Sequence, residues 1–124
     1  MTSSEIGELA KALAAAQGEM TAASKDATNP HFKSRYATLA SVWDAIRGPL
    51  SWNGLSVSQV LETPENGPGV IVRTLLIHSS GQWISSRYVM PIADKLTPQA
   101  VGSAITYARR YALSAIVGIA PDDD

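Results

Sequence analysis

The most constraining feature of the sequence is a block of three strand-like segments at residues 54–91 that leads directly into a long helical pattern. The segments are rich in β-branched and apolar side chains, and they read GLSVSQVLE, VIVRTLLIH and WISSRYVMP. Pro91 suits the end of a strand, because proline cannot donate a hydrogen bond to a sheet. The connections TPENGPG and SSGQ consist of turn residues, which favour antiparallel pairing of neighbouring strands. The block predicts a three-stranded antiparallel meander with the second strand in the centre.

A long helix is expected to follow this meander. Thr97 can cap the helix, Pro98 suits its first position, and Gly118 suits its end. At about 100° per residue, eight apolar side chains share one side and should face the sheet: Val101, Ala104, Ile105, Ala108, Ala112, Ala115, Ile116 and Ile119. The predicted fold therefore contains a β-β-β-α unit.

Two further helices are expected before the meander. Thr2 and Glu5 fit a capping box for a first helix over about residues 3–25. Thr38 can cap a second helix that Pro49 bends or shortens and Gly54 ends. The segment between them reads as a loop, because Pro30 breaks any helix. The predicted class is α+β, as one domain over residues 1–124 with an acidic tail from about residue 121.

Composition narrows the class of protein. The chain has no cysteine, which excludes disulfides and thiolate metal sites and suits a reducing cytosol. No apolar run reaches the roughly 18 residues that a membrane helix needs, and a signal-peptide layout is absent. The net charge is only −1, but it is unevenly spread. Residues 1–28 hold four acidic and two basic side chains, a net of −2, whereas residues 69–111 hold five basic and one acidic, a net of +4. A basic second half suits a polyanionic partner.

The expected last helix contains the run TYARRYAL, with two arginines between two tyrosines. Periodicity places Arg110 nearly opposite the sheet, beside Ser103 and Ser114. The same periodicity puts Tyr107 and Tyr111 on one flank of this helix, and Arg109 on the other flank with Leu113. Two interpretations remain open: the tyrosines edge the core while the arginines pair with carboxylates, or the arginines neutralise phosphates while the tyrosines stack on unpaired bases.

A second cluster of basic and aromatic residues occurs in the expected loop HFKSRYA, where Lys33, Arg35 and Tyr36 follow Pro30. Such a mixture suits an arm that closes over a nucleic-acid backbone, although its rings could also anchor the loop to the core. Arg73 and Arg87 lie in adjacent strands and either extend a basic track across the sheet or form ordinary ion pairs.

No catalytic constellation is present, so we expect a protein that is not an enzyme and that uses no cofactor and no metal. His31 and His78 lack partners at metal-binding spacing, and neither a P-loop nor a G-x-S-x-G elbow occurs. The terminal Asp122, Asp123 and Asp124 are more typical of a solvated tail than of a cation site.

Much of the chain resembles the ERF family of phage-type single-strand annealing recombination proteins. The resemblance covers about residues 29–124 and rests on three runs, NPHFKSRYATLASVWDAI, HSSGQWISSRYVMP and TPQAVGSAITYARRYALSAIVGIAPDDD. The last run is the most specific.

The resemblance implies a β-β-β-α annealing core that binds single-stranded DNA and pairs it with a complementary strand without ATP. It also implies a homo-oligomer, as a ring or helical filament, that acts in recombination and repair in the cytoplasm of a bacterial host. A replication or single-strand-binding protein is a further expected partner, and no membrane is involved. The expected nucleic-acid-binding residues are Lys33, Arg35, Tyr36, Arg73, Arg87, Tyr107, Arg109, Arg110 and Tyr111. The alternative is an oligomeric scaffold whose basic helix binds acidic proteins.

Overall fold

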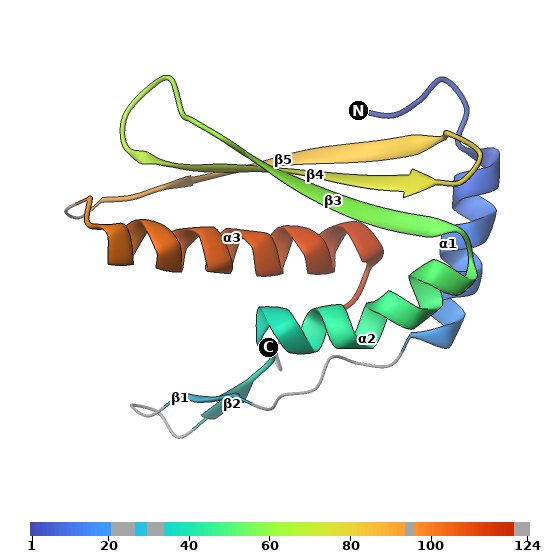
Figure 1. Cartoon of the computed structure of the whole chain (residues 1–124), viewed down its shortest axis with the longest axis horizontal. Coiled ribbons are helices and arrows are strands. Elements are labelled where there is room, and N and C mark those ends of the chain that lie inside the picture. Colours follow the sequence, from blue (N-terminus) through green and yellow to red (C-terminus); the bar gives the residue numbers. More distant parts are fainter. Residues whose placement is uncertain (21–26, 30–33, 94–95, 121–124) are drawn as a thin grey trace.

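The structure is a computed structural model, and it describes residues 1–20, 27–29, 34–93 and 96–120. Three helices and five strands occur in these residues (Figure 1). In chain order they are α1 (Gly7–Glu19), β1 (Ala27–Asn29), β2 (Ser34–Tyr36), α2 (Leu39–Trp52), β3 (Leu55–Glu62), β4 (Gly69–His78), β5 (Trp83–Pro91) and α3 (Pro98–Val117). The α+β class and the order of the three main strands and the long last helix are confirmed.

The main sheet is an antiparallel meander in the order β3-β4-β5, as predicted. Its register places Val60, Arg73 and Arg87 in one row across the three strands. The tight β4–β5 turn depends on Gly81, whose φ of +94° is readily available only to glycine. Within that turn, the His78 amide donates to the Gln82 carbonyl at 2.8 Å.

One face of the sheet packs on the helices. In β4, the side chains of Val70, Val72 and Leu76 are buried toward the helices. Arg73 directly follows Val72, so its side chain points to the other face of the sheet. Figure 1 shows α3 and α2 on one side of the sheet and α1 upright at the end of the sheet near the β4–β5 turn. The long helix α3 therefore covers one face of the sheet, and none of the helices in the described residues covers the other face.

The ends of α3 are those that the sequence predicts. The Thr97 side chain accepts a hydrogen bond from the Ala100 amide at 3.0 Å, and Pro98 is the first helical residue. Gly118 ends the helix in the left-handed region with a φ of +84°. The Gln17 side chain of α1 donates to the Val117 carbonyl at 2.9 Å, which ties the end of α3 to the first helix.

The buried surface of α3 is wider than predicted. Ala104, Ala108 and Ala112 face the sheet as expected. Leu113 and Ser114, however, are 0% and 2% exposed, although periodicity placed Leu113 on a flank of the helix and Ser114 opposite the sheet. The reason is α2, which packs against the second half of α3 on the side away from the sheet, so that half is enclosed from both sides (Figure 1).

The predicted capping box of α1 is wrong. Thr2 forms a bridge with Ile84 at the edge of β5 instead, and the Ser3 amide donates to the Trp83 carbonyl at 2.8 Å. The helix begins at Gly7, where the Leu9 amide donates to the Gln82 side chain at 2.9 Å. A tertiary contact thus supplies the cap, and residues 21–25 of the predicted helix lie outside the described residues.

The region between α1 and the meander differs in two ways from the prediction. Part of the expected loop forms a short antiparallel ladder, in which Ala27–Asn29 pairs with Ser34–Tyr36. Strands of three residues are too short to show a periodic pattern, but the extended bias of Asn29 before Pro30 is consistent with this pairing. In α2, Pro49 is buried inside the helix without ending it, and the helix runs on to Trp52.

Within the described part of the chain, none of the helices combines the length and the apolar character required to cross a membrane.

Candidate nucleic-acid interface

The first half of α3 has a surface that α2 does not cover. In Figure 1, α2 begins below the middle of α3, so only the second half of α3 lies over it. A groove of about 530 Å³ occupies the corner between the start of α2 and the first half of α3. Its lining is mostly small, hydroxyl-bearing and polar: Thr38, Leu39, Pro98, Gln99, Gly102, Ser103, Thr106, Tyr107 and Arg110.

Arg110 forms one end of this groove and is held in a fixed arrangement. The central carbon of its guanidinium lies 5.3 Å from the ring centre of Tyr107 and 4.8 Å from that of Tyr111. One terminal nitrogen donates to the carbonyl of Ala37 at 3.1 Å, just before the cap of α2. Cation–π contacts of this length stabilise a guanidinium without neutralising it. Arg110 therefore brings a guanidinium, held between two rings and a backbone carbonyl, to the lining of the groove.

The two tyrosines beside Arg110 are not equivalent. Their ring centres are 4.6 Å apart and their planes are tilted by 49°. Tyr107 is 44% exposed, whereas Tyr111 is half-buried. Tyr107 also borders a second hollow of about 290 Å³ between α3 and the end of β5. It is therefore a ridge between two hollows, with ring surface accessible to a flat ligand.

Arg109 lies outside the groove. Its Nε donates to the Gln59 side chain of β3 at 3.1 Å, and the Gln59 amide nitrogen donates back to the Arg109 carbonyl at 3.1 Å. The same nitrogen lies 3.1 Å from the hydroxyl of Thr74, which is fully buried. These contacts join α3 to the sheet and place Arg109 beside β3, on a different flank of α3 from Tyr107.

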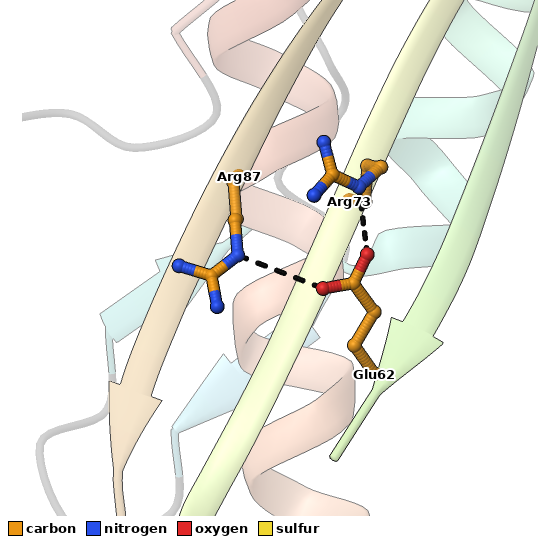
Figure 2. A network of polar contacts seen from close by, with 3 residues as sticks. All are labelled: Glu62, Arg73 and Arg87. Atoms are coloured by element: carbon orange, nitrogen blue, oxygen red, sulfur yellow. Dashed lines mark hydrogen bonds and ion pairs between the residues drawn. The ribbon is translucent and has the colours of Figure 1, made fainter. Parts of the chain in front are cut away.

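Arg73 and Arg87 lie on the outer face of the sheet, opposite to α3 (Figure 2). Glu62 of β3 reaches both arginines: Arg73 Nε donates to one carboxylate oxygen at 2.7 Å, and Arg87 Nε lies 3.6 Å from the other. The pKa of Glu62 is lowered, mainly by the hydrogen bond from Arg73, despite some desolvation that acts in the opposite direction. The sheet separates these arginines from the groove.

The arm residues are only partly placed. Lys33 lies outside the described residues, and Arg35 and Tyr36 belong to β2, opposite Thr28 and Ala27. β2 leads through Ala37 directly into the cap of α2. The end of this strand is therefore adjacent to the groove, because Arg110 binds the Ala37 carbonyl.

Several lining positions were not predicted from the sequence. Thr38 was assigned only as a helix cap, and Gln99, Gly102 and Thr106 were assigned no role. In α3 these residues follow the helical period that also contains Tyr107 and Arg110, so the small and hydroxyl side chains on that face were the available signal. The helical period of α3 does not reveal where α2 lies, so the groove between the two helices was not predicted.

The described residues contain no group of three or more histidine, cysteine, aspartate or glutamate side chains arranged to hold a metal ion. His78 is at the end of β4, where its Nδ1 lies 2.9 Å from the Ser80 hydroxyl. The Ser80 amide also donates to this nitrogen at 3.1 Å, so both hydrogen bonds of the ring are made within the β4–β5 turn.

Comparison with known proteins gives one positive result. No curated protein sequence and no solved structure matches the chain significantly. The sequence profile of the ERF superfamily, in contrast, matches residues 9–124, which include α3, the groove and nearly all of the fold. The chain belongs to the ERF superfamily.

Proposed function

We propose that this protein binds single-stranded DNA in the groove beside α3 and anneals it to a complementary strand without nucleotide hydrolysis. Membership of the ERF superfamily supports a phage-type single-strand annealing role. The observation that carries the proposal is the arrangement of Arg110 between Tyr107 and Tyr111, at the end of an open groove. It combines a guanidinium with the exposed ring of Tyr107.

This chemistry suits an unpaired strand. A guanidinium binds phosphate oxygens without reading sequence. An exposed ring such as Tyr107 stacks on any base, and such stacking is worth about 1–3 kcal/mol per base. Contacts to phosphates and base faces leave the pairing edges accessible, and those edges are what a complementary strand needs.

The remaining expected site residues take separate places in the proposal. Lys33, Arg35 and Tyr36 would close over the strand from the arm that leads into the groove. Arg109 would add charge at the β3 side of α3. Arg73 and Arg87 would contact a strand only on the outer face of the sheet, where Glu62 competes with the phosphate for both guanidiniums.

The proposed working form is a homo-oligomer, either a ring or a helical filament, that acts in recombination and repair in the cytoplasm of a bacterial host. Repetition of the groove along one strand multiplies a modest affinity per protomer. A replication or single-strand-binding protein is a further proposed partner.

A mobility-shift assay with labelled poly-dT tests the proposal directly, followed by addition of an oligonucleotide and its complement to measure annealing. We expect a shift in the absence of ATP and faster duplex formation than for the naked strands. Light scattering of the same samples gives the particle size.

The alternative, a scaffold that binds acidic proteins, predicts large particles with no shift of poly-dT. That result would refute strand binding. An enzyme would shorten the labelled strand in the presence of Mg²⁺, whereas we expect the strand to stay intact.

A further inference from the structure

A second pair of aromatic and basic side chains, Trp43 and Arg47, lies on α2 outside the lining of the groove. The guanidinium of Arg47 lies over the ring of Trp43, 5.5 Å from the ring centre. Arg47 is exposed and Trp43 is half-buried. Within the described residues, no carboxylate forms an ion pair with Arg47.

The pair is continuous with the groove. Leu39, which lines the groove, lies one helical turn before Trp43, and Arg47 lies one turn after it. Residues four apart are neighbours on the same helix surface, so Leu39, Trp43 and Arg47 form one row along α2. At about 1.5 Å per residue, this row extends the groove by about 12 Å.

We infer that the Leu39–Trp43–Arg47 row, hereafter the α2 row, continues the binding path and holds the next nucleotides of a single strand that leaves the groove. This inference rests on the proposed function. Arg47 would bind a phosphate, and the ring of Trp43 would contact a base or sugar beside it. About 12 Å of path corresponds to roughly two to four nucleotides, given the 3.4 Å per nucleotide along each strand of B-DNA and the greater reach of an unstacked chain.

The charge and shape of the row favour a polyanion over an apolar partner. A guanidinium held over an indole ring is pre-organised and loses little freedom when it binds a phosphate. This is the same combination as Arg110 with its two tyrosines, repeated on the neighbouring helix. Asp44 is also exposed on α2 and lies three residues before Arg47, so the two side chains are neighbours on the helix surface, but they form no ion pair within the described residues.

The helix supplies its own control. Trp52 is 73% exposed, and it lies nine residues after Trp43, about two and a half turns later, which places it on the opposite side of α2. Its ring packs on Gly48, where an added Cβ would be 3.1 Å from it. If any exposed tryptophan on α2 promotes binding, then loss of either Trp43 or Trp52 should lower the affinity for single-stranded DNA. If the α2 row holds the strand, only loss of Trp43 should lower it.

The first measurement is the salt dependence of binding to labelled dT oligomers by Arg47→Ala, Arg47→Lys and Trp52→Ala. Loss of one phosphate contact should lower the slope of log K against log salt by about 0.7 in Arg47→Ala. Arg47→Lys should keep the slope but bind more weakly than the wild type, because an ammonium does not stack as a guanidinium does. Trp52→Ala should match the wild type.

The second measurement uses tryptophan fluorescence. The chain has three tryptophans, so Trp52→Phe with Trp83→Phe leaves Trp43 as the only one. We expect quenching of this single tryptophan when dT is added, and Arg47→Ala in the same background should reduce the quenching. Trp43→Phe in the wild-type background retains a ring and should weaken binding less than Trp43→Leu.

Two results would overturn the inference while leaving the proposed function intact: an unchanged salt slope in Arg47→Ala, or no quenching of Trp43 while fluorescence anisotropy shows that dT is bound. A smaller particle by light scattering for Arg47→Ala, with binding lost in parallel, would identify the row as a subunit contact and overturn it as well. Absence of dT binding by the wild type would instead refute the proposed function, and the α2 row with it.

Discussion

Replacement of Tyr107 by alanine tests the groove most directly. The side chain is 44% exposed, so little of the core depends on it. It contributes one of the two rings on Arg110, at 5.3 Å. The substitution therefore removes a stacking surface and part of the support of one charged group.

The expected loss of affinity follows from these two contacts. Removal of one base-stacking ring costs about 1–3 kcal/mol, which corresponds to about 5- to 150-fold weaker binding. The cation–π contact at an exposed site is worth about 0.5–1 kcal/mol, so the change in unfolding free energy should be small. Tyr107→Phe keeps both contacts and should bind nearly as well as the wild type.

Fluorescence anisotropy with a labelled dT oligomer at several salt concentrations separates the two effects. If Tyr107 acts by stacking, the affinity falls while the salt slope stays constant. If its loss instead displaces Arg110, the slope also falls by about 0.7, the value for one phosphate contact on a single strand. A thermal melt of each variant confirms that the fold is intact.

Two outcomes would refute the reasoning. Unchanged affinity in Tyr107→Ala would remove the exposed ring from the binding surface. Equal damage from phenylalanine and alanine would show that the hydroxyl group, not the ring, is what the strand requires.

Three other substitutions test separate parts of the structure. Arg110→Ala should lower the salt slope of single-strand binding by about 0.7. Arg109→Ala should have a smaller effect, because Arg109 is held by Gln59 outside the groove. Equal effects of the two substitutions in anisotropy titrations would contradict this distinction. Glu62→Gln frees two guanidiniums on the outer face of the sheet and should steepen the salt slope of binding. Because the pKa of Glu62 is lowered in the folded state, its contribution to stability is present above the unfolded pKa and is lost on acidification through the folded pKa. The melting temperatures of the wild type and Glu62→Gln should therefore differ at neutral pH and converge below the usual carboxyl range of about 4–4.5. Leu113→Ala should destabilise the protein by about 2–5 kcal/mol in urea unfolding, because Leu113 is fully buried, and a negligible change would show that α2 does not cover this part of α3.

The sheet and α3 were predictable because their signals are local. Alternation, turn residues and the Thr97–Pro98 cap each specify structure within a few residues. The start of α1 was not predictable, because Gln82 caps it from a distant turn and Thr2 pairs with β5. A capping box in the sequence competes with such contacts, and nothing in the local pattern reveals which one is more stable.

The candidate site was predictable in its chemistry but not in its geometry. The sequence placed Arg110 opposite the sheet and Tyr107 on a flank of the same helix, and the structure brings the two side chains together. It could not separate Arg73 and Arg87 from them, because periodicity gives the face of a strand but not which face a helix covers. Burial of Leu113 likewise depends on α2, whose packing partner is not encoded in the pattern of α3.

The alanine stripe of α3 has a consequence for how binding strength can change. Ala104, Ala108 and Ala112 are 7%, 0% and 4% exposed, so at these three positions only a methyl group separates the helix from the strands. A bulkier side chain at Ala108 would push the helix axis outward and carry Tyr107 and Arg110 with it, since they lie one and two residues away. The alignment of the proposed binding surface thus depends on buried alanines, and under the proposed function a bulkier residue there would change the affinity for a strand without altering any residue that lines the groove.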